Sequence, residues 1–190
     1  LSIVLFTYYV TIKEESKSTE YAKKSMQEIV DEKSELIAIT FDRIKTQVGL
    51  LGIWTEKLLQ DETISQDLSA EYVLRKDGTI VRKRDESVSI TAQSNIMVPK
   101  TTVKTAELMK EINLTEELDE AFAQILEKED VTWAYIATKD NLLRCSPYRK
   151  LQDDFTSDHS QIKDIFYTMA NEENNPQRKP VWTPPYTDYL

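Results

Sequence analysis

The segment Val131-Thr132-Trp133-Ala134-Tyr135-Ile136-Ala137-Thr138 carries the strongest strand pattern in this sequence. Side chains alternate between the two faces of a strand, so Trp133 and Tyr135 share one face and the residues between them share the other. An aromatic face of this kind is typical of a protein core, but an indole N–H and a phenol hydroxyl also suit the wall of a pocket. The turn-forming residues 139–141 then predict a return strand over 142–145.

A helix is predicted after this strand pair. The segment 158–171 repeats apolar residues at the three- and four-residue spacing of an α-helix. Tyr167 lies beside the apolar face, and Lys163 lies four residues earlier, within reach on the helix surface. Lys163 is therefore either a positive charge for a bound group or part of a solvated helix edge.

The chain closes on a stiff aromatic tail, Pro180-Val181-Trp182-Thr183-Pro184-Pro185-Tyr186-Thr187-Asp188-Tyr189-Leu190. Three prolines fix the backbone and remove N–H donors, which favours an extended segment. The tail combines the Trp182 indole, the Tyr186 hydroxyl and the Asp188 carboxylate. It is either a recognition surface or a proline-rich connector whose aromatic rings are packed for burial.

Short elements are predicted before the aromatic strand. Residues 72–76 and 79–82 flank Asp77-Gly78, a pair that favours a type I′ turn with positive φ at both turn residues, so we expect a hairpin. Residues 88–90 and 96–98 read as two further short strands.

Two helices are expected next. Residues 102–112 form the first, and Thr115 is placed to cap the start of the second. The second helix has a core-facing set at helical spacing, which comprises Leu118, Ala121, Phe122, Ile125 and Leu126.

The N-terminal third predicts one long amphipathic helix over residues 14–60. Its apolar residues recur at spacings of three, four and seven. A helix of this length would run about 70 Å, longer than a small core can cover, so part of its apolar face is expected to meet another helix or a second subunit.

The first twelve residues, LSIVLFTYYVTI, are uncharged and apolar. A spanning helix needs ~20 apolar residues, so twelve cannot cross a bilayer unaided. With two tyrosines near the end of the segment, we interpret residues 1–12 as the outer end of a transmembrane helix, the alternative being a buried N-terminal strand or helix.

The composition argues against several functional classes. With 33 acidic and 24 basic residues the formal net charge is −9, which disfavours nucleic acid as a partner. Only 3 of the 190 residues are glycine, which argues against a glycine-rich phosphate loop. Cys145 and His159 are the single cysteine and histidine, too few for a Cys/His metal cluster or an intrachain disulfide. No spacing singles out a catalytic pair, so we expect no catalytic residues, no metal and no cofactor.

Taken together, these motifs resemble the double Cache extracytoplasmic sensor domains of bacterial and archaeal receptors, specifically their membrane-distal half. The resemblance covers nearly the whole chain. Its parts are residues 133–138, Cys145-Ser146-Pro147-Tyr148, Phe166-Tyr167 with Ala170, and above all residues 181–188, Val-Trp-Thr-Pro-Pro-Tyr-Thr-Asp.

The resemblance implies an α+β fold in which a long N-terminal helix packs on a PAS-like central antiparallel sheet with flanking helices. It further implies a ligand pocket lined by Tyr167, Tyr186 and Asp188, with the acid receiving an ammonium group. Including the aromatic neighbours and the nearby lysine, the expected ligand-binding residues are Asp188, Tyr186, Trp182, Tyr167, Tyr135, Trp133 and Lys163.

This chain departs from the family pattern at three positions. Asp164 stands where the family has an arginine for the ligand carboxylate, Phe166 replaces a tryptophan, and His159 replaces a tyrosine. Because an acid repels a carboxylate, a standard amino-acid ligand is disfavoured. Either Lys163 substitutes for the arginine, or the ligand is an amine without a carboxylate.

The expected organisation is a membrane-helix end over 1–12, a signalling helix over 13–62 and a Cache subdomain over 63–190 that lacks the family's later strands. The expected function is extracytoplasmic sensing of a small molecule by a receptor in the cell membrane, with a homodimer through the long helix and any kinase, phosphatase, cyclase or chemoreceptor output in another part. The domain itself is not expected to be an enzyme. The alternative is a structural, dimerisation or partner-docking ectodomain.

Overall fold

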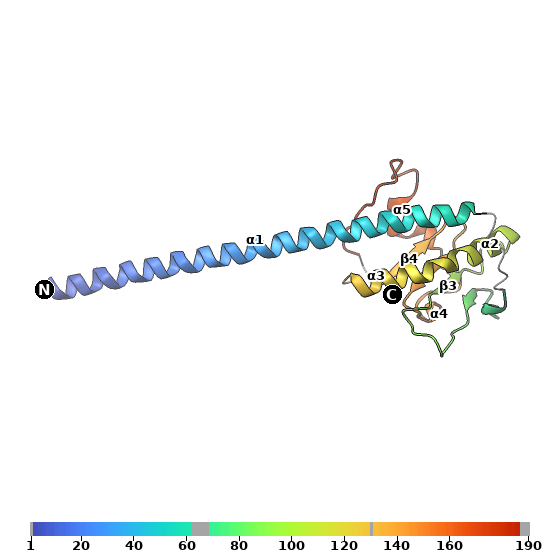
Figure 1. Ribbon diagram of the computed structural model, residues 1–190, viewed down its shortest axis with the longest axis horizontal. Helices are drawn as coiled ribbons and strands as arrows, with labels where there is room; N and C mark the ends of the chain where they lie inside the picture. Colours follow the sequence, from blue (N-terminus) through green and yellow to red (C-terminus); the bar gives the residue numbers. More distant parts are fainter. Residues whose placement is uncertain (1, 62–68, 130, 187–190) are drawn as a thin grey trace. The chain divides into compact units, whose positions relative to one another are not determined.

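This computed structural model describes the backbone of residues 2–61, 69–129 and 131–186 (Figure 1). The chain divides into two compact units, residues 1–43 and residues 44–190. The architecture is α+β, with a long N-terminal helix, a five-stranded antiparallel sheet and flanking helices. This confirms the fold class predicted from the sequence at that level.

Helix α1 runs from Ser2 to Gln60 without interruption. No proline occurs in this range, and apolar residues recur along it, so the predicted long helix is confirmed. In the first unit the described side chains from residue 13 onward are almost all exposed. Within the described parts of the chain, no helix carries an apolar stretch sufficient to cross a membrane.

The sheet lies in the second unit and has the strand order β1-β2-β3-β5-β4. All four pairings are antiparallel, so β4 and β1 form the two edges. The strands are β1 (Tyr72–Leu74), β2 (Ile80–Arg82), β3 (Asn95–Val98), β4 (Ala134–Ala137) and β5 (Leu143–Ser146).

The predicted hairpin between β1 and β2 is confirmed, but its turn is not type I′. Gly78 alone of the two central residues has a positive φ, 87°. The Gly78 N–H donates to the Arg75 carbonyl at 3.0 Å, and the Arg75 N–H donates to the Thr79 carbonyl at 2.8 Å. This is the three-residue loop with a glycine bulge. The Asp77 carboxylate fixes it by accepting from the Thr79 N–H and hydroxyl at 3.0 and 2.7 Å.

The strand predictions hold for two segments and are wrong or too long for others. Residues 96–98 belong to β3, and residues 142–145 largely coincide with β5. Residues 88–90 form no strand: the Val88 N–H donates to the Asp85 carbonyl and the Val88 carbonyl accepts from the Arg84 guanidinium, while the Ile90 carbonyl accepts from the Tyr148 N–H at 2.6 Å. The aromatic strand begins at Ala134 rather than at residue 131.

The helices flanking the sheet differ from the sequence prediction at their ends. The first begins at Ala106, where the Thr105 hydroxyl accepts from the Leu108 N–H at 3.1 Å. Thr115 does not cap the start of the second helix; it is the C-cap residue of α2, and its buried hydroxyl donates to the Glu111 carbonyl at 2.9 Å. The observed elements are η1 (Ser69–Glu71), α2 (Ala106–Leu114), η2 (Thr115–Leu118), α3 (Asp119–Lys128), α4 (Leu151–Asp154), η3 (Gln161–Lys163) and α5 (Ile165–Ala170).

The single helix predicted over 158–171 is wrong. The chain forms η3 and then α5, with an extended residue, Asp164, between them at ψ 154°. The Asp164 carboxylate lies 2.8 Å from the His159 Nε2 atom. The Asp164 N–H donates to the Gln161 carbonyl at 3.1 Å, and the Asp164 carbonyl accepts from the Thr168 N–H at 2.9 Å, so the backbone of this residue closes η3 and opens α5.

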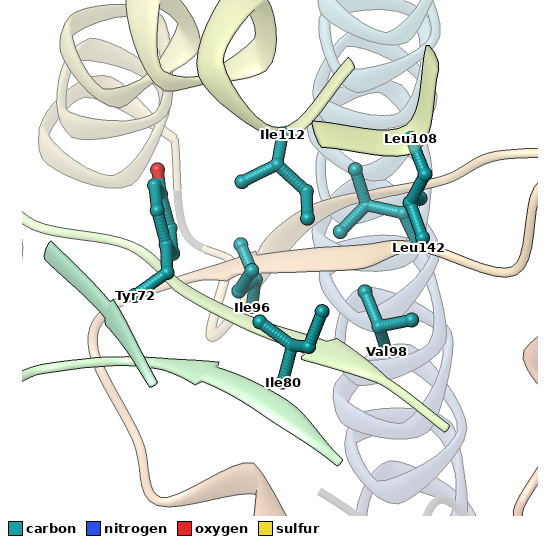
Figure 2. Close-up of a cluster of buried hydrophobic side chains, with 7 residues drawn as sticks. All are labelled: Tyr72, Ile80, Ile96, Val98, Leu108, Ile112 and Leu142. Atoms are coloured by element: carbon teal, nitrogen blue, oxygen red, sulfur yellow. The ribbon is translucent and has the colours of Figure 1, made fainter. Parts of the chain in front are cut away.

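Alternation along the strands divides the core between the two faces of the sheet. On one face, Leu108 and Ile112 of α2 point toward the side chains of the strands (Figure 2). The full cluster is Tyr72, Ile80, Ile96, Val98, Leu108, Ile112 and Leu142. The other face buries Met97, Leu143 and Cys145, so the single cysteine is packed in the core.

Helix α3 completes the first face as predicted. Phe122 and Leu118 are buried against Leu58 of α1 and Ala134 of β4, with Ile125 partly buried beside them. This packing ties the last turns of α1 to the edge of the sheet that carries the aromatic residues.

Candidate functional site

A cavity of about 590 Å³ lies at the β4 edge of the sheet, within the second unit. Its walls come from α1, α3, β4, α5 and the tail, and residues from both faces of β4 line it. Six of the lining residues are aromatic, which gives the cavity a largely apolar surface with polar atoms at a few points. They are Trp133, Tyr135, Phe166, Tyr167, Trp182 and Tyr186.

The strand wall is held in place by ring contacts. The Tyr135 and Phe166 rings meet edge to face, with centroids 5.2 Å apart, which joins β4 to α5. The Arg149 guanidinium carbon lies 5.4 Å from the centroid of the Trp133 ring. Trp133 and Tyr135 thus belong both to the partly buried edge of the core and to the cavity wall, and the two interpretations of this strand face are compatible.

Tyr167 reaches the cavity from α5. Burial raises the pKa of its hydroxyl, and the negative charges of Asp140 and Glu111 raise the pKa further. The hydroxyl therefore stays protonated at neutral pH. It can donate a hydrogen bond to a ligand and can accept one in return.

The tail closes the cavity only in part. Trp182 is 49% exposed and Tyr186 is 39% exposed, although both line the cavity. The preceding turn is joined to α1 by an ion pair of 3.4 Å between Arg178 and Glu56. A bound molecule would meet this wall on the solvent side of the cavity.

The predicted ligand-binding residues are brought together with two exceptions. The cavity wall includes Trp133, Tyr135, Tyr167, Trp182 and Tyr186. Lys163 is exposed on η3, ahead of the break at Asp164, and does not line the cavity. Asp188 lies outside the described residues.

Two of the three departures from the pattern of the family that the chain resembles, Asp164 and His159, pair with each other. Asp164 is bonded to His159, whose ring also lies 4.7 Å, between centroids, from the Phe155 ring. Neither Asp164 nor His159 lines the cavity, whereas Phe166 does. The residue at the family's arginine position is therefore engaged outside the cavity.

Sequence reasoning missed two parts of the wall. The cavity is also lined by residues of α1, which are Ile44, Gln47, Val48 and Leu51. The helical spacing placed the apolar ones on the apolar face of the helix and did not mark Gln47. Glu129, at the end of α3, also lines it and is 8% exposed. No local motif marks Glu129, since its position depends on where α3 ends relative to β4.

Apart from the cavity, a polar cluster lies on the face of the sheet that α2 and α3 cover. The fully buried Arg144 guanidinium donates to the Ser94 hydroxyl at 2.8 Å, the Thr115 hydroxyl at 3.0 Å and the Tyr72 hydroxyl at 3.1 Å. It also donates to the Ile112 carbonyl at 2.7 Å. Burial raises the pKa of the Tyr72 hydroxyl to about 12, against the opposing effect of Arg144.

Arg82 extends the cluster to the acidic residues around it. Its guanidinium donates to Asp119 at 2.6 Å and Glu71 at 2.9 Å, and it also bonds Glu116. Each of these groups therefore has a partner inside the cluster, which is the requirement for keeping charges in a protein interior. The cluster joins β1, β2 and β5 to α2 and α3 and is structural in its geometry.

The chemistry available in the cavity is recognition by ring faces, hydroxyls and one buried carboxylate. Among the described residues, no group of three or more histidine, cysteine, aspartate or glutamate side chains is placed to hold a metal. Comparisons of this chain with protein-family models, curated proteins and solved structures found no match. The argument about function therefore starts from the cavity itself.

Proposed function

We propose that this chain is the membrane-distal, ligand-binding half of a double Cache sensor, in a receptor of the cell membrane whose sensing domain is extracytoplasmic. The domain binds a small organic molecule and is not itself an enzyme. A PAS-like arrangement of the sheet belongs to the same proposal.

One observation carries the proposal. Five residues chosen from the sequence as pocket residues, from a strand, a helix and the tail, line one cavity of about 590 Å³. That volume is in the range of cavities that hold small molecules. The lining includes six aromatic residues and protonated hydroxyls such as that of Tyr167, which suits recognition rather than bond cleavage.

Helix α1 gives the cavity a route for signalling. Val48 and Leu51 line the cavity, and Leu58 further along the same helix is buried in the core. A ligand that contacts α1 and the β4 edge together stabilises one position of the helix relative to that edge. A ligand that binds one of two such helix positions more tightly than the other shifts the equilibrium between them.

The test is a thermal-shift screen of the chain with amines, amino acids and small carboxylates. We expect at least one class to raise the melting temperature, because a ligand that binds only the folded state stabilises it by mass action. Trp182→Ala should abolish the shift while leaving the unliganded protein folded, since Trp182 is half exposed.

Trp54→Ala is the matched control. Trp54 lies on α1 and, like Trp182, is about half exposed, at 44%. It does not line this cavity. If no compound in the panel stabilises the protein, or if both tryptophan variants weaken binding equally, the sensing proposal fails.

A structural or partner-docking ectodomain is the second candidate, favoured by the exposed apolar residues of α1. Met26, Val30 and Ile37 are each more than half exposed. On this alternative Asp188→Ala changes neither ligand response nor folding, whereas on the sensing proposal it abolishes the response. Self-association through α1 is compatible with both candidates.

A further inference from the structure

We infer that the cavity takes an alkylated ammonium cation, with Glu129 as its counter-charge. This inference rests on the proposed sensing function and names the ligand class of the same cavity. Glu129 belongs to none of the sequence motifs discussed above, so the cavity geometry alone points to it.

The sign of the buried charge is the first argument. Glu129 is 8% exposed on the cavity wall. The other charged residues of the wall, Lys139, Glu172 and Lys179, are all exposed. Charges on exposed side chains are screened, whereas the buried carboxylate of Glu129 acts at lower dielectric, so the part of the wall that Glu129 forms favours a positive group.

The aromatic lining is the second argument, and it selects the kind of cation. Ring faces attract cations, and tryptophan does so most strongly. A primary ammonium carries three N–H donors that each need an acceptor. An alkylated ammonium needs fewer acceptors and presents methyl groups to rings such as Trp133, Phe166 and Trp182.

The position of Glu129 is the third argument. Its backbone N–H donates to the Ile125 carbonyl at 2.9 Å, which closes α3, and its own carbonyl accepts from the Val131 N–H at 2.9 Å. These two bonds fix the residue between α3 and the approach to β4. The backbone that carries the carboxylate is therefore held in place on the cavity wall, which limits the positions that the carboxylate can reach.

The experiment compares choline with 3,3-dimethylbutan-1-ol, its neutral carbon isostere, by calorimetric titration of the 190-residue chain. The pair share shape and hydroxyl group and differ in the charge. We expect the wild-type protein to prefer choline by about tenfold or more, the size of a cation–ring contact combined with a charge pair. Tetramethylammonium should compete with choline.

Glu129→Gln removes the charge and retains the shape. It should reduce the preference for choline to within about threefold, the remainder coming from the rings alone. Glu127→Gln is the matched control, because Glu127 is exposed on α3 two residues away and does not line the cavity. It should leave the preference unchanged.

Any result other than those expected above overturns the inference. Equal binding of choline and its isostere by the wild-type protein does so without any variant, so a misfolded Glu129→Gln protein does not block the test. Loss of the preference in Asp188→Asn but not in Glu129→Gln would place the counter-charge on the tail. Binding of neither compound, together with stabilisation by another class in the thermal-shift panel, would reject the cation and leave the sensing proposal standing.

Discussion

Arg144 places a positive charge in the interior of the second unit, with 0% of its side chain exposed. Replacing it with methionine fills much of the volume but leaves the Ile112 carbonyl and three hydroxyls without their donor. We expect Arg144→Met to lower the free energy of unfolding by about 3 to 5 kcal/mol, as when one partner of a buried network is removed. Urea denaturation followed by circular dichroism measures the change.

The control for this prediction is Arg75→Met. Arg75 is paired with Asp77 at 3.3 Å, but both side chains are 39% exposed. Such a surface pair contributes little, so the loss should stay below about 1 kcal/mol. Similar losses in the two variants would show that the cluster around Arg144 contributes no more than an exposed ion pair.

At the residue scale, the sequence predicted side chains that act through their own segment and missed those that act through the fold. Trp133 and Tyr135 were found because strand alternation is local. Arg144 was not singled out, because one of its partners, Tyr72, lies 72 positions away. Glu129 was missed for the same reason, since only tertiary packing places it on the wall of the cavity.

The β1–β2 hairpin and helix α1 place two glycines in opposite situations, and the same substitution should therefore have opposite effects. Gly78 has a φ of 87°, and a Cβ built there would lie 2.9 Å from the Lys100 Cβ atom. Gly52 lies in α1 with nothing within 4 Å of such a Cβ. The two positions test whether backbone conformation or helix propensity decides the outcome.

Gly78→Ala should destabilise the protein by about 1 to 2 kcal/mol, because alanine in the left-handed region is strained and its methyl group also crowds Lys100. Gly52→Ala should stabilise it by up to about 1 kcal/mol through helix propensity. Urea midpoints of both variants against wild type give the comparison. If Gly78→Ala is neutral, the turn adopts another conformation in solution.

At the element scale, periodicity was sufficient for long elements and insufficient for junctions. The apolar spacing predicted α1, and the core face of α3 was predicted residue by residue. The break at Asp164 was missed, because the apolar spacing of a helix is unchanged by one extended residue within it. The turn at Gly78 was assigned the wrong type because Asp-Gly occurs both in two-residue turns and in bulged loops.

At the scale of the whole molecule, the cavity depends on segments that lie far apart in the sequence. The aromatic strand, the last helix and the tail were expected to contribute residues to one pocket, and they share the lining of one cavity. The contribution of α1 could not be predicted, because an apolar helix face does not specify which of its residues meet a core and which remain exposed. In the first unit those residues remain exposed, which gives the protein an apolar surface on a helix of 59 residues.

Val30 and Ile37 lie on that surface, two turns apart on one side of α1, and are 55% and 58% exposed. We expect the wild-type chain to form a dimer through α1, since a second copy offers the same apolar stripe. The double variant Val30→Lys with Ile37→Lys should shift the dimer to monomer in sedimentation equilibrium. The control, Glu28→Gln with Glu35→Gln, makes the same change of two in net charge on the opposite side of the helix and should leave the dimer intact. A wild-type chain that sediments as a monomer at all concentrations, or a lysine variant that still dimerises, would rule out α1 as the contact.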